Sequence, residues 1–211
     1  MSVRMRATRR SEHHTNAWSG GETTELAIFP PNSQYATRDF GWRLSSATVL
    51  AETSEFTRLP GYNRILLLLT GELRLQSAGG QGTILHPGEQ HAFRGDTPIT
   101  SHGLATDFNL ILGPGWDGSL VHAGLAPSER RIWRPADTTR DTTRHALVYC
   151  WQGQVLATPA HGPAHSLGAG DLLWATLDTG CSAMFDIVNE SNGQSTLVFV
   201  TVADKGDQPA S

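Results

Sequence analysis

Two stretches that begin 82 positions apart decide the fold. Residues 65–89 read ILLLLTGELRLQSAGGQGTILHPGE, and residues 147–171 read LVYCWQGQVLATPAHGPAHSLGAGD. Each has an apolar run, a glycine suited to a hairpin (Gly71 or Gly153), a second strand-like run and a closing Leu-x-x-Gly-acid turn. Self-similarity at one fixed spacing is the signature of a repeated structural unit. The chain is therefore predicted to contain two copies of one small β-structure.

Short β-rich runs continue on both sides of these stretches. They contain many β-branched and aromatic residues and are short for helices, so the chain is predicted to be all-β. With 22 Gly, 11 Pro and only 17% charged residues, many tight turns are expected rather than disorder or a coiled coil. The runs occupy residues 23–29, 42–51, 64–69, 107–112, 146–151, 172–177, 182–188 and 196–203.

A strand, a glycine hairpin and a Leu-x-Pro-Gly-acid turn resemble the small antiparallel barrel of the cupins. This barrel is a jelly roll, in which two sheets pack together. Two copies would make a bicupin, so we expect two tandem small antiparallel jelly-roll barrels in one compact unit. The expected parts are a disordered leader over residues 1–15, a first barrel with a ligand pocket over 16–115, a second barrel over 116–204 and a tail over 205–211.

The cupin resemblance supplies a test for a metal site. Cupin enzymes usually hold a metal with a His-x-His pair, a Glu and a later His. In the two copies here the Glu position falls on Arg64 and Ala146, and the last His position falls on Ile99 and Cys181. The segments where the His-x-His pair would stand contain no histidine. Neither copy has an imidazole and carboxylate set for a divalent metal, so no metal and no other cofactor is expected.

The charge balance argues against partners that carry many phosphates. Sixteen Lys and Arg stand against twenty Asp and Glu, which gives a net charge of −4. No stretch is basic enough to neutralise a series of phosphates, so no nucleic acid is expected as a partner. Residues 1–14 lack the apolar segment of a signal peptide or a membrane span, so a cytoplasmic protein with no membrane partner is expected. A homodimer is left open.

Several predicted strands carry polar residues on one face. Alternate residues of a strand share a face, so each polar pair lies opposite apolar neighbours such as Trp42 and Leu44. An arginine also stands at the start of the apolar run 65–69, which is predicted to be a buried strand. The pairs are Thr23 with Glu25, Arg43 with Ser45, and Asp107 with Asn109, and the arginine before the apolar run is Arg64.

Two interpretations of these polar faces are open. They could look outward to water, as half-buried antiparallel strands commonly do. Alternatively, they could point into the mouth of a barrel and recognise a small polar molecule. Arginine suits a carboxylate because its planar fork donates two parallel hydrogen bonds, whereas Asp, Glu and Asn suit an amine, amide or imidazole N–H. The loop after Trp18 could close one side, with Gly21 letting backbone N–H groups approach a ligand.

Five segments together resemble the HutD/Ves family, which is named for a gene in bacterial histidine-utilisation operons and for a stress-associated relative. They occur in the family's order and span most of the first half of the chain. The second half is matched only by the general cupin pattern. The segments are WSGGETTE (18–25), DFGWRLSSA (39–47), FTRLPGYNR (56–64), FRGD (93–96) and DFNL (107–110).

The resemblance implies a cytoplasmic bicupin with a pocket in its first barrel and no established catalytic activity. It also implies a regulatory role in histidine catabolism through binding of a pathway metabolite, with urocanate or N-formylglutamate as suggested ligands. Both are carboxylates, so a small carboxylate metabolite is the expected partner and no residue is expected to be catalytic. The expected ligand-binding residues are Trp18, Gly21, Thr23, Glu25, Arg43, Ser45, Arg64, Asp107 and Asn109.

Two other functions remain as alternatives. The first is a metal-independent enzyme, an isomerase or hydrolase, that acts on a similar small acid with Glu25 or Asp107 as general base. The sequence shows neither a Gly-x-Ser-x-Gly elbow nor a Cys–His nucleophile pattern for it. The second is an interaction protein that uses Trp151, Trp174 and Phe185 as an aromatic face, against which stands the ordinary burial of large aromatics in a core.

Overall fold

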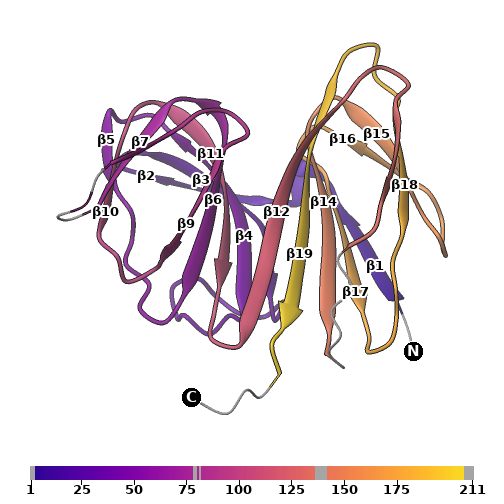
Figure 1. The fold of residues 1–211 in the computed structure, drawn as a ribbon, viewed down its shortest axis with the longest axis horizontal. Helices are drawn as coiled ribbons and strands as arrows, with labels where there is room; N and C mark the ends of the chain where they lie inside the picture. The colour runs from indigo at the N-terminus through magenta and orange to yellow at the C-terminus, as the bar shows by residue number, and fades with distance from the viewer. Residues whose placement is uncertain (1–2, 78–79, 81, 136–141, 207–211) are drawn as a thin grey trace. The chain divides into compact units, whose positions relative to one another are not determined.

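The computed structural model describes residues 3–77, 80, 82–135 and 142–206 (Figure 1). Within these ranges the chain is almost entirely β, which confirms the predicted fold class, and the helical element is a short 3-10 turn, η1 (Arg10–Glu12). None of the described residues forms a helix with the length and apolar character needed to cross a membrane. The chain divides into two compact units, which we call the first barrel (His13–Trp116) and the second barrel (Asp117–Ser211 together with Met1–Glu12).

The first barrel is built from a six-stranded and a four-stranded antiparallel sheet. In spatial order, the larger sheet contains β2 (His14–Trp18), β3 (Gly21–Phe29), β4 (Trp42–Val49), β11 (Ala105–Leu112), β6 (Asn63–Gly71) and β9 (Gln90–Arg94). The smaller sheet contains β5 (Thr53–Glu55), β10 (Ile99–His102), β7 (Leu73–Ser77) and β8 (Thr83–Leu85).

The second barrel repeats this plan with five and four strands. Its larger sheet contains β1 (Val3–Thr8), β17 (Leu172–Leu177), β14 (Arg144–Gln152), β19 (Ser195–Asp204) and β12 (Trp116–Leu125). Its smaller sheet contains β13 (Arg130–Trp133), β18 (Phe185–Asn189), β15 (Gln154–Pro159) and β16 (His165–Gly168). The aromatic residue Phe185 is fully buried in the core of this barrel, so it packs the interior rather than an exposed face.

The repeat predicted from the sequence is visible as matching hydrogen bonds. In the first barrel the Gly88 N–H donates to the Leu68 carbonyl at 2.8 Å, and in the second the Gly170 N–H donates to the Cys150 carbonyl at 2.7 Å. Both glycines have a positive φ, 90° and 91°, which an L side chain rarely adopts. The acid that follows each glycine accepts a hydrogen bond from the backbone N–H three residues earlier, at 2.8 and 3.0 Å. The two copies therefore share one turn structure.

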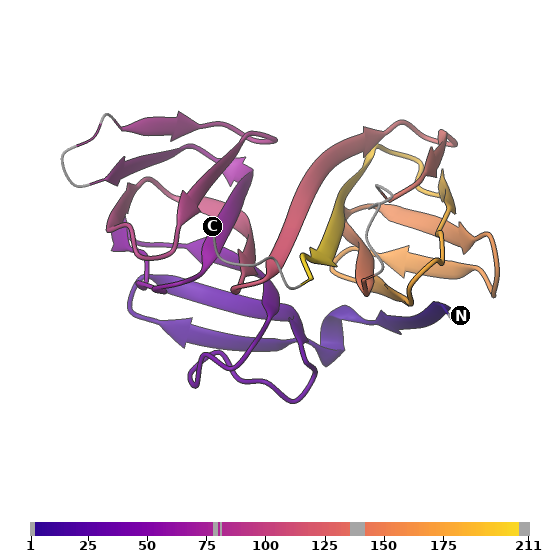
Figure 2. The same ribbon diagram turned by 60° about the horizontal axis from the view of Figure 1, so that its bottom comes forward.

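The N-terminal segment differs from the expectation of a disordered leader over residues 1–15. Residues 3–8 form β1, which pairs antiparallel with β17 in the second barrel, and in Figure 2 this indigo strand lies beside the orange ones. Val3, Met5 and Ala7 pack against the core of that barrel, while the arginines between them are exposed. The alternation of apolar and basic residues in this segment is the pattern of a half-buried strand. Of the expected tail over 205–211, residues 207–211 lie outside the described ranges.

Strand β6 is an interior strand of the six-stranded sheet, flanked by β11 and β9. Leu66, Leu67 and Leu68 of this strand are each no more than 1% exposed, so both of its faces are covered. Burying a leucine side chain contributes roughly 2 kcal/mol. This apolar strand therefore holds Arg64, its second residue, at a fixed position inside the barrel.

Candidate functional site

Three neighbouring strands, β4, β11 and β6, place the predicted polar residues in rows on one face of the sheet. Side chains directly opposite one another in a sheet share a face, so the antiparallel register fixes which residues meet. The rows are Ala47, Asp107 and Leu68; then Ser45, Asn109 and Leu66; then Arg43, Ile111 and Arg64. Arg43 and Arg64 thus stand at the same level on either side of Ile111.

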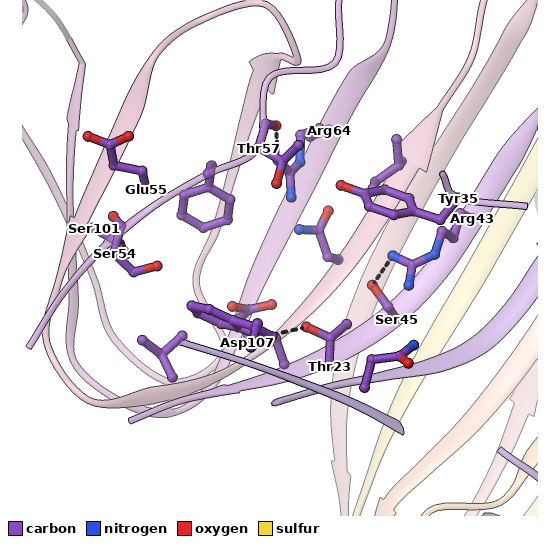
Figure 3. Close-up of a pocket in the computed structure, with 17 residues that line it drawn as sticks. Thr23, Tyr35, Arg43, Ser45, Ser54, Glu55, Thr57, Arg64, Ser101 and Asp107 are labelled. Atoms are coloured by element: carbon purple, nitrogen blue, oxygen red, sulfur yellow. Dashed lines mark hydrogen bonds between the residues drawn. The ribbon is translucent and has the colours of Figure 1, made fainter. Parts of the chain in front are cut away.

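These polar residues face the inside of the first barrel and not the solvent. The exposed fractions are 7% for Arg43, 6% for Arg64, 2% for Asp107 and 5% for Asn109. They line a cavity of about 300 Å³, at the small end of the range for sites that hold small molecules. Figure 3 shows both arginines pointing into this cavity. The predicted residues that line it are Trp18, Thr23, Arg43, Ser45, Arg64, Asp107 and Asn109.

Two predicted site residues, Glu25 and Gly21, are not among the residues that line the cavity. Glu25 instead pairs with Arg43. Gly21 has a φ of +154° and faces the β4 backbone so closely that a Cβ atom would lie 2.0 Å from the Thr48 carbonyl oxygen. Gly21 is therefore required for the close approach of β3 to β4, which differs from its predicted role at the ligand.

Arg43 is held in place by other side chains of the protein. Its Nε donates to the Glu25 carboxylate at 2.7 Å and its Nη1 donates to the Ser45 hydroxyl at 3.1 Å. The guanidinium carbon also lies 4.4 Å from the centre of the Tyr35 ring, a distance typical of a cation–π contact. The charge of Arg43 is thus balanced within the barrel.

Arg64 has a weaker set of partners. Its Nη1 donates to the Thr57 carbonyl at 3.3 Å, and its guanidinium carbon lies 4.8 Å from the ring centre of Phe56 and 5.5 Å from that of Phe93. Its Nε is buried and has no hydrogen-bond partner among the described residues, and no carboxylate of the described ranges forms an ion pair with it. Burial lowers the pKa of Arg64 to about 10, which still leaves it charged at neutral pH.

Asp107 lies on β11, in the row farthest from the two arginines. Its Oδ1 atom is buried and has no hydrogen-bond partner in the part of the chain that the structure describes. Burial raises the pKa of Asp107 to about 7, and the positive charge of Arg64 partly opposes that shift. Asp107 therefore changes its charge near neutral pH, so it can accept a hydrogen bond when ionised and donate one when protonated.

Three buried polar atoms around this cavity share the lack of a partner. They are Arg64 Nε, Asp107 Oδ1 and Asn109 Oδ1, considered against the described residues. A buried polar atom without a hydrogen bond costs about 1–3 kcal/mol, so proteins rarely keep several of them in one place. Their convergence on one cavity indicates a site that is completed by a polar ligand or by water.

The rim of the cavity includes residues beyond those predicted from the sequence. Trp18, a predicted site residue at this rim, is 38% exposed and donates its indole N–H to the Thr23 hydroxyl at 3.1 Å. Ala47 and Val49 could have been identified, because they follow Arg43 and Ser45 on the same face of β4. The others come from β2, from two loops and from the smaller sheet, and no local sequence pattern identifies them. They include Asn16, Tyr35, Ser54, Glu55, Phe56, Thr57 and Ser101.

The side chains of this site do not fit the metal centre found in cupin enzymes. A cationic residue, Arg64, lines the cavity at the sequence position that corresponds to the Glu ligand of cupin enzymes. Within the described ranges, no group of three or more His, Cys, Asp or Glu is arranged to hold a metal ion. The guanidinium of Arg64 suits an anion instead, and the side-chain oxygens of Asp107 and Asn109 suit an N–H group.

Comparisons with known proteins agree with this fold. The family model named HutD matches residues 10–193. A conserved protein of unknown function from Pseudomonas aeruginosa PAO1 is 25% identical with a TM-score of 0.75, covering 94% of this chain and 98% of its own. HutD from Pseudomonas fluorescens SBW25 is 24% identical with a TM-score of 0.65, covering 93% and 98%. An oxalate decarboxylase from Lactobacillus farciminis is 10% identical with a TM-score of 0.64, covering 92% and 85%. These neighbours support a cupin fold.

Proposed function

Because this chain belongs to the HutD family, which links it to histidine utilisation, we propose that its first barrel binds a small carboxylate metabolite of histidine catabolism without converting it. The proposed ligands are urocanate and N-formylglutamate. In this proposal the protein regulates the pathway by sensing or sequestering the metabolite.

The observation that carries this proposal is the buried guanidinium of Arg64. It lines the cavity, and no carboxylate of the described residues pairs with it. A buried charge without a partner of opposite charge costs roughly several kcal/mol. A bound carboxylate would offset this cost by accepting two parallel hydrogen bonds from the Arg64 guanidinium. Arg43 is less suited to this role, because Glu25 already balances its charge and its Nε and Nη1 atoms donate to Glu25 and Ser45.

The part of the cavity beyond the row of Arg43 and Arg64 supports a ligand that also carries an N–H group. Asp107 and Asn109 each have a buried side-chain oxygen without a hydrogen-bond donor among the described residues. An imidazole or amide N–H would satisfy one of them. Urocanate carries a carboxylate and an imidazole, and N-formylglutamate carries carboxylates and an amide, so both match this pairing of groups.

Aromatic rings give the cavity walls that suit a flat ligand. Trp18, Tyr35 and Phe56 all line it. Aromatic rings favour offset-stacked or edge-to-face contacts with other rings, which adds to the burial of apolar surface. This arrangement supports urocanate more than N-formylglutamate, because only urocanate has a planar conjugated ring system.

Calorimetric titration of the purified protein with urocanate, N-formylglutamate and histidine tests this function. We expect saturable binding of the first two and weaker binding of histidine, whose ammonium group has no assigned partner near Arg64. Nuclear magnetic resonance of the same mixtures should show unchanged ligand after prolonged incubation. Absence of binding by all three compounds would contradict the proposal.

A metal-independent enzyme is the second candidate. It is supported by Asp107, since a buried carboxyl group that titrates near pH 7 inside a cavity is suited to general acid–base catalysis. The reaction would be an isomerisation or hydrolysis of a similar small acid held by Arg64. Formation of a product that disappears with Asp107→Asn would favour this candidate over simple binding.

A further inference from the structure

We infer that, through Asp107, the functional groups of the ligand determine whether the protein takes up a proton on binding. A ligand that offers only a carboxylate binds with Asp107 protonated and so takes up a proton. A ligand that offers both a carboxylate and an N–H binds with Asp107 ionised and takes up none. This inference rests on the proposed function, because it concerns the same cavity and the same Arg64 anchor.

The first support is the separation of the two charged groups. Asp107 and Arg64 line one cavity, yet no ion pair joins them. The backbone of Arg64 lies at the level of Ile111, four residues from Asp107, which corresponds to about 13 Å between backbone positions along a strand. The two side chains still interact electrostatically. Figure 3 shows Asp107 and Arg64 at opposite sides of the cavity. The space between them is where a ligand would lie, so the two groups can interact with different ends of it.

The second support is the charge environment of Asp107. Arg64 of β6 is the charged group that favours the ionised form of Asp107, against the effect of burial. Arg43 of β4 is paired with Glu25 of β3, so this pair contributes little net charge. The other titratable groups around the cavity are Tyr35 and Arg38 from the loop before β4, Glu55 at the exposed rim on β5, and His91 of β9, which stacks on Phe93.

Ligand binding changes this balance in a predictable direction. A carboxylate bound to Arg64 cancels the positive charge that holds Asp107 ionised, so the protonated form becomes more favourable. The proton then comes from solvent. An N–H donor placed at Oδ1 has the opposite effect, because a hydrogen bond to the ionised form stabilises it. Oδ1 is free to accept such a bond within the described structure.

The inference can be tested with two acids that differ in one group. Urocanate and its phenyl analogue trans-cinnamate share a flat acrylate, but only urocanate has a ring N–H. Titration calorimetry at pH 8 in phosphate and in Tris gives the number of protons taken up from the dependence of heat on buffer. We expect about 0.7 to 1 proton for cinnamate and less than about 0.3 for urocanate. The affinity for cinnamate should also fall about fivefold to tenfold per pH unit above pH 7.5.

Asp107→Asn and a matched carboxylate-to-amide control complete the experiment. Asp107→Asn should bind cinnamate without proton uptake, whereas Asp96→Asn, an exposed change on the same barrel, should behave like the wild type. Equal proton uptake with both acids, or uptake that persists in Asp107→Asn, would overturn this inference alone. No binding of either acid to the wild type would overturn the proposed function and this inference with it. The pH dependence of affinity needs no variant, so the test does not depend on the folding of Asp107→Asn.

Discussion

Arg43 and Arg64 occupy equivalent positions on the two strands that flank β11, on either side of Ile111, but within the described residues only Arg43 is paired with a carboxylate. The pair of Arg43 and Glu25 fixes one wall of the cavity. Arg64 presents a buried cation to the space inside it. The same residue type therefore has a structural role on one strand and a proposed ligand-binding role on another.

Replacing Arg64 should separate binding from stability. Arg64→Gln removes the proposed carboxylate anchor, so we expect affinity for urocanate to fall by about 100-fold or more, in line with the loss of charge-assisted hydrogen bonds. The free energy of unfolding should stay the same or rise, because a poorly compensated buried charge is removed. Titration calorimetry and urea unfolding measure the two quantities. Retained affinity in this variant would count against Arg64 as the anchor.

Unlike removal of the Arg64 charge, breaking the ion pair of Arg43 and Glu25 should lower the stability of the protein. Glu25→Gln leaves the buried Arg43 guanidinium without its charged partner, so we expect the free energy of unfolding to fall by about 1–3 kcal/mol. A double-mutant cycle of Glu25→Gln and Arg43→Gln, followed by urea unfolding, measures the coupling of the two residues. A coupling energy near zero would show that the pair is not a stabilising element of the wall.

Asp107 should make the first barrel less stable as the pH rises. Its pKa is raised in the folded state, so the folded protein binds more protons than the unfolded chain between about pH 4 and pH 7. Stability is therefore lost as pH increases through this window. From pH 5 to pH 8 the loss should be roughly 2–3 kcal/mol. Urea unfolding of the wild type and of Asp107→Asn at both pH values measures this loss as the difference between the two proteins. If stability changed with pH equally in both proteins, Asp107 would not be its cause.

His145 should give the second barrel the reverse dependence. Burial lowers the pKa of His145 to about 3, with the positive charge of Arg4 acting in the same direction. Because the unfolded chain protonates this group near pH 6.5, stability is lost as the pH falls below that value. His145→Gln should reduce this acid sensitivity, as followed by urea unfolding from pH 7 to pH 4. An unchanged acid profile would show that His145 does not cause it.

The strand β1 should be required for the stability of the second barrel. Deletion of residues 1–8 removes one of the two strands paired with β17 and uncovers the core surface covered by Val3, Met5 and Ala7. We expect a loss of about 3 kcal/mol or more in the unfolding free energy of that barrel, since three half-buried apolar side chains are removed. Replacing the exposed Arg4 and Arg6 with Gln is the matched control and should change stability by less than 1 kcal/mol. Equal stability after the deletion would contradict a structural role for β1.

The sequence was most informative where local patterns decide the structure. The 82-residue repeat predicted the duplicated turns, now seen as the same hydrogen bonds at Gly88 and Gly170. Alternation along strands also placed Arg43 with Ser45 and Asp107 with Asn109 on common faces, and the structure brings these faces to one cavity. These features depend on neighbours in the chain, so a single sequence contains them.

Features that depend on distant pairing were not predictable in the same way. The pairing of Glu25 with Arg43 requires the register of β3 against β4, which includes a bulge near residue 26. Phe56 and Ser101 reach the cavity from a loop and from the smaller sheet. The residues of β1 do not indicate that this strand pairs with β17 of the second barrel, which is far away in the sequence. Long-range strand pairing determines each of these outcomes.

The most direct test of the central claim is a crystal structure of the protein soaked with urocanate. The account predicts a carboxylate in the first barrel with its oxygen atoms about 2.7–2.9 Å from nitrogen atoms of the Arg64 guanidinium, and the imidazole directed at Asp107 or Asn109. Urocanate bound away from Arg64, or an empty cavity at a concentration that saturates the protein in solution, would contradict it.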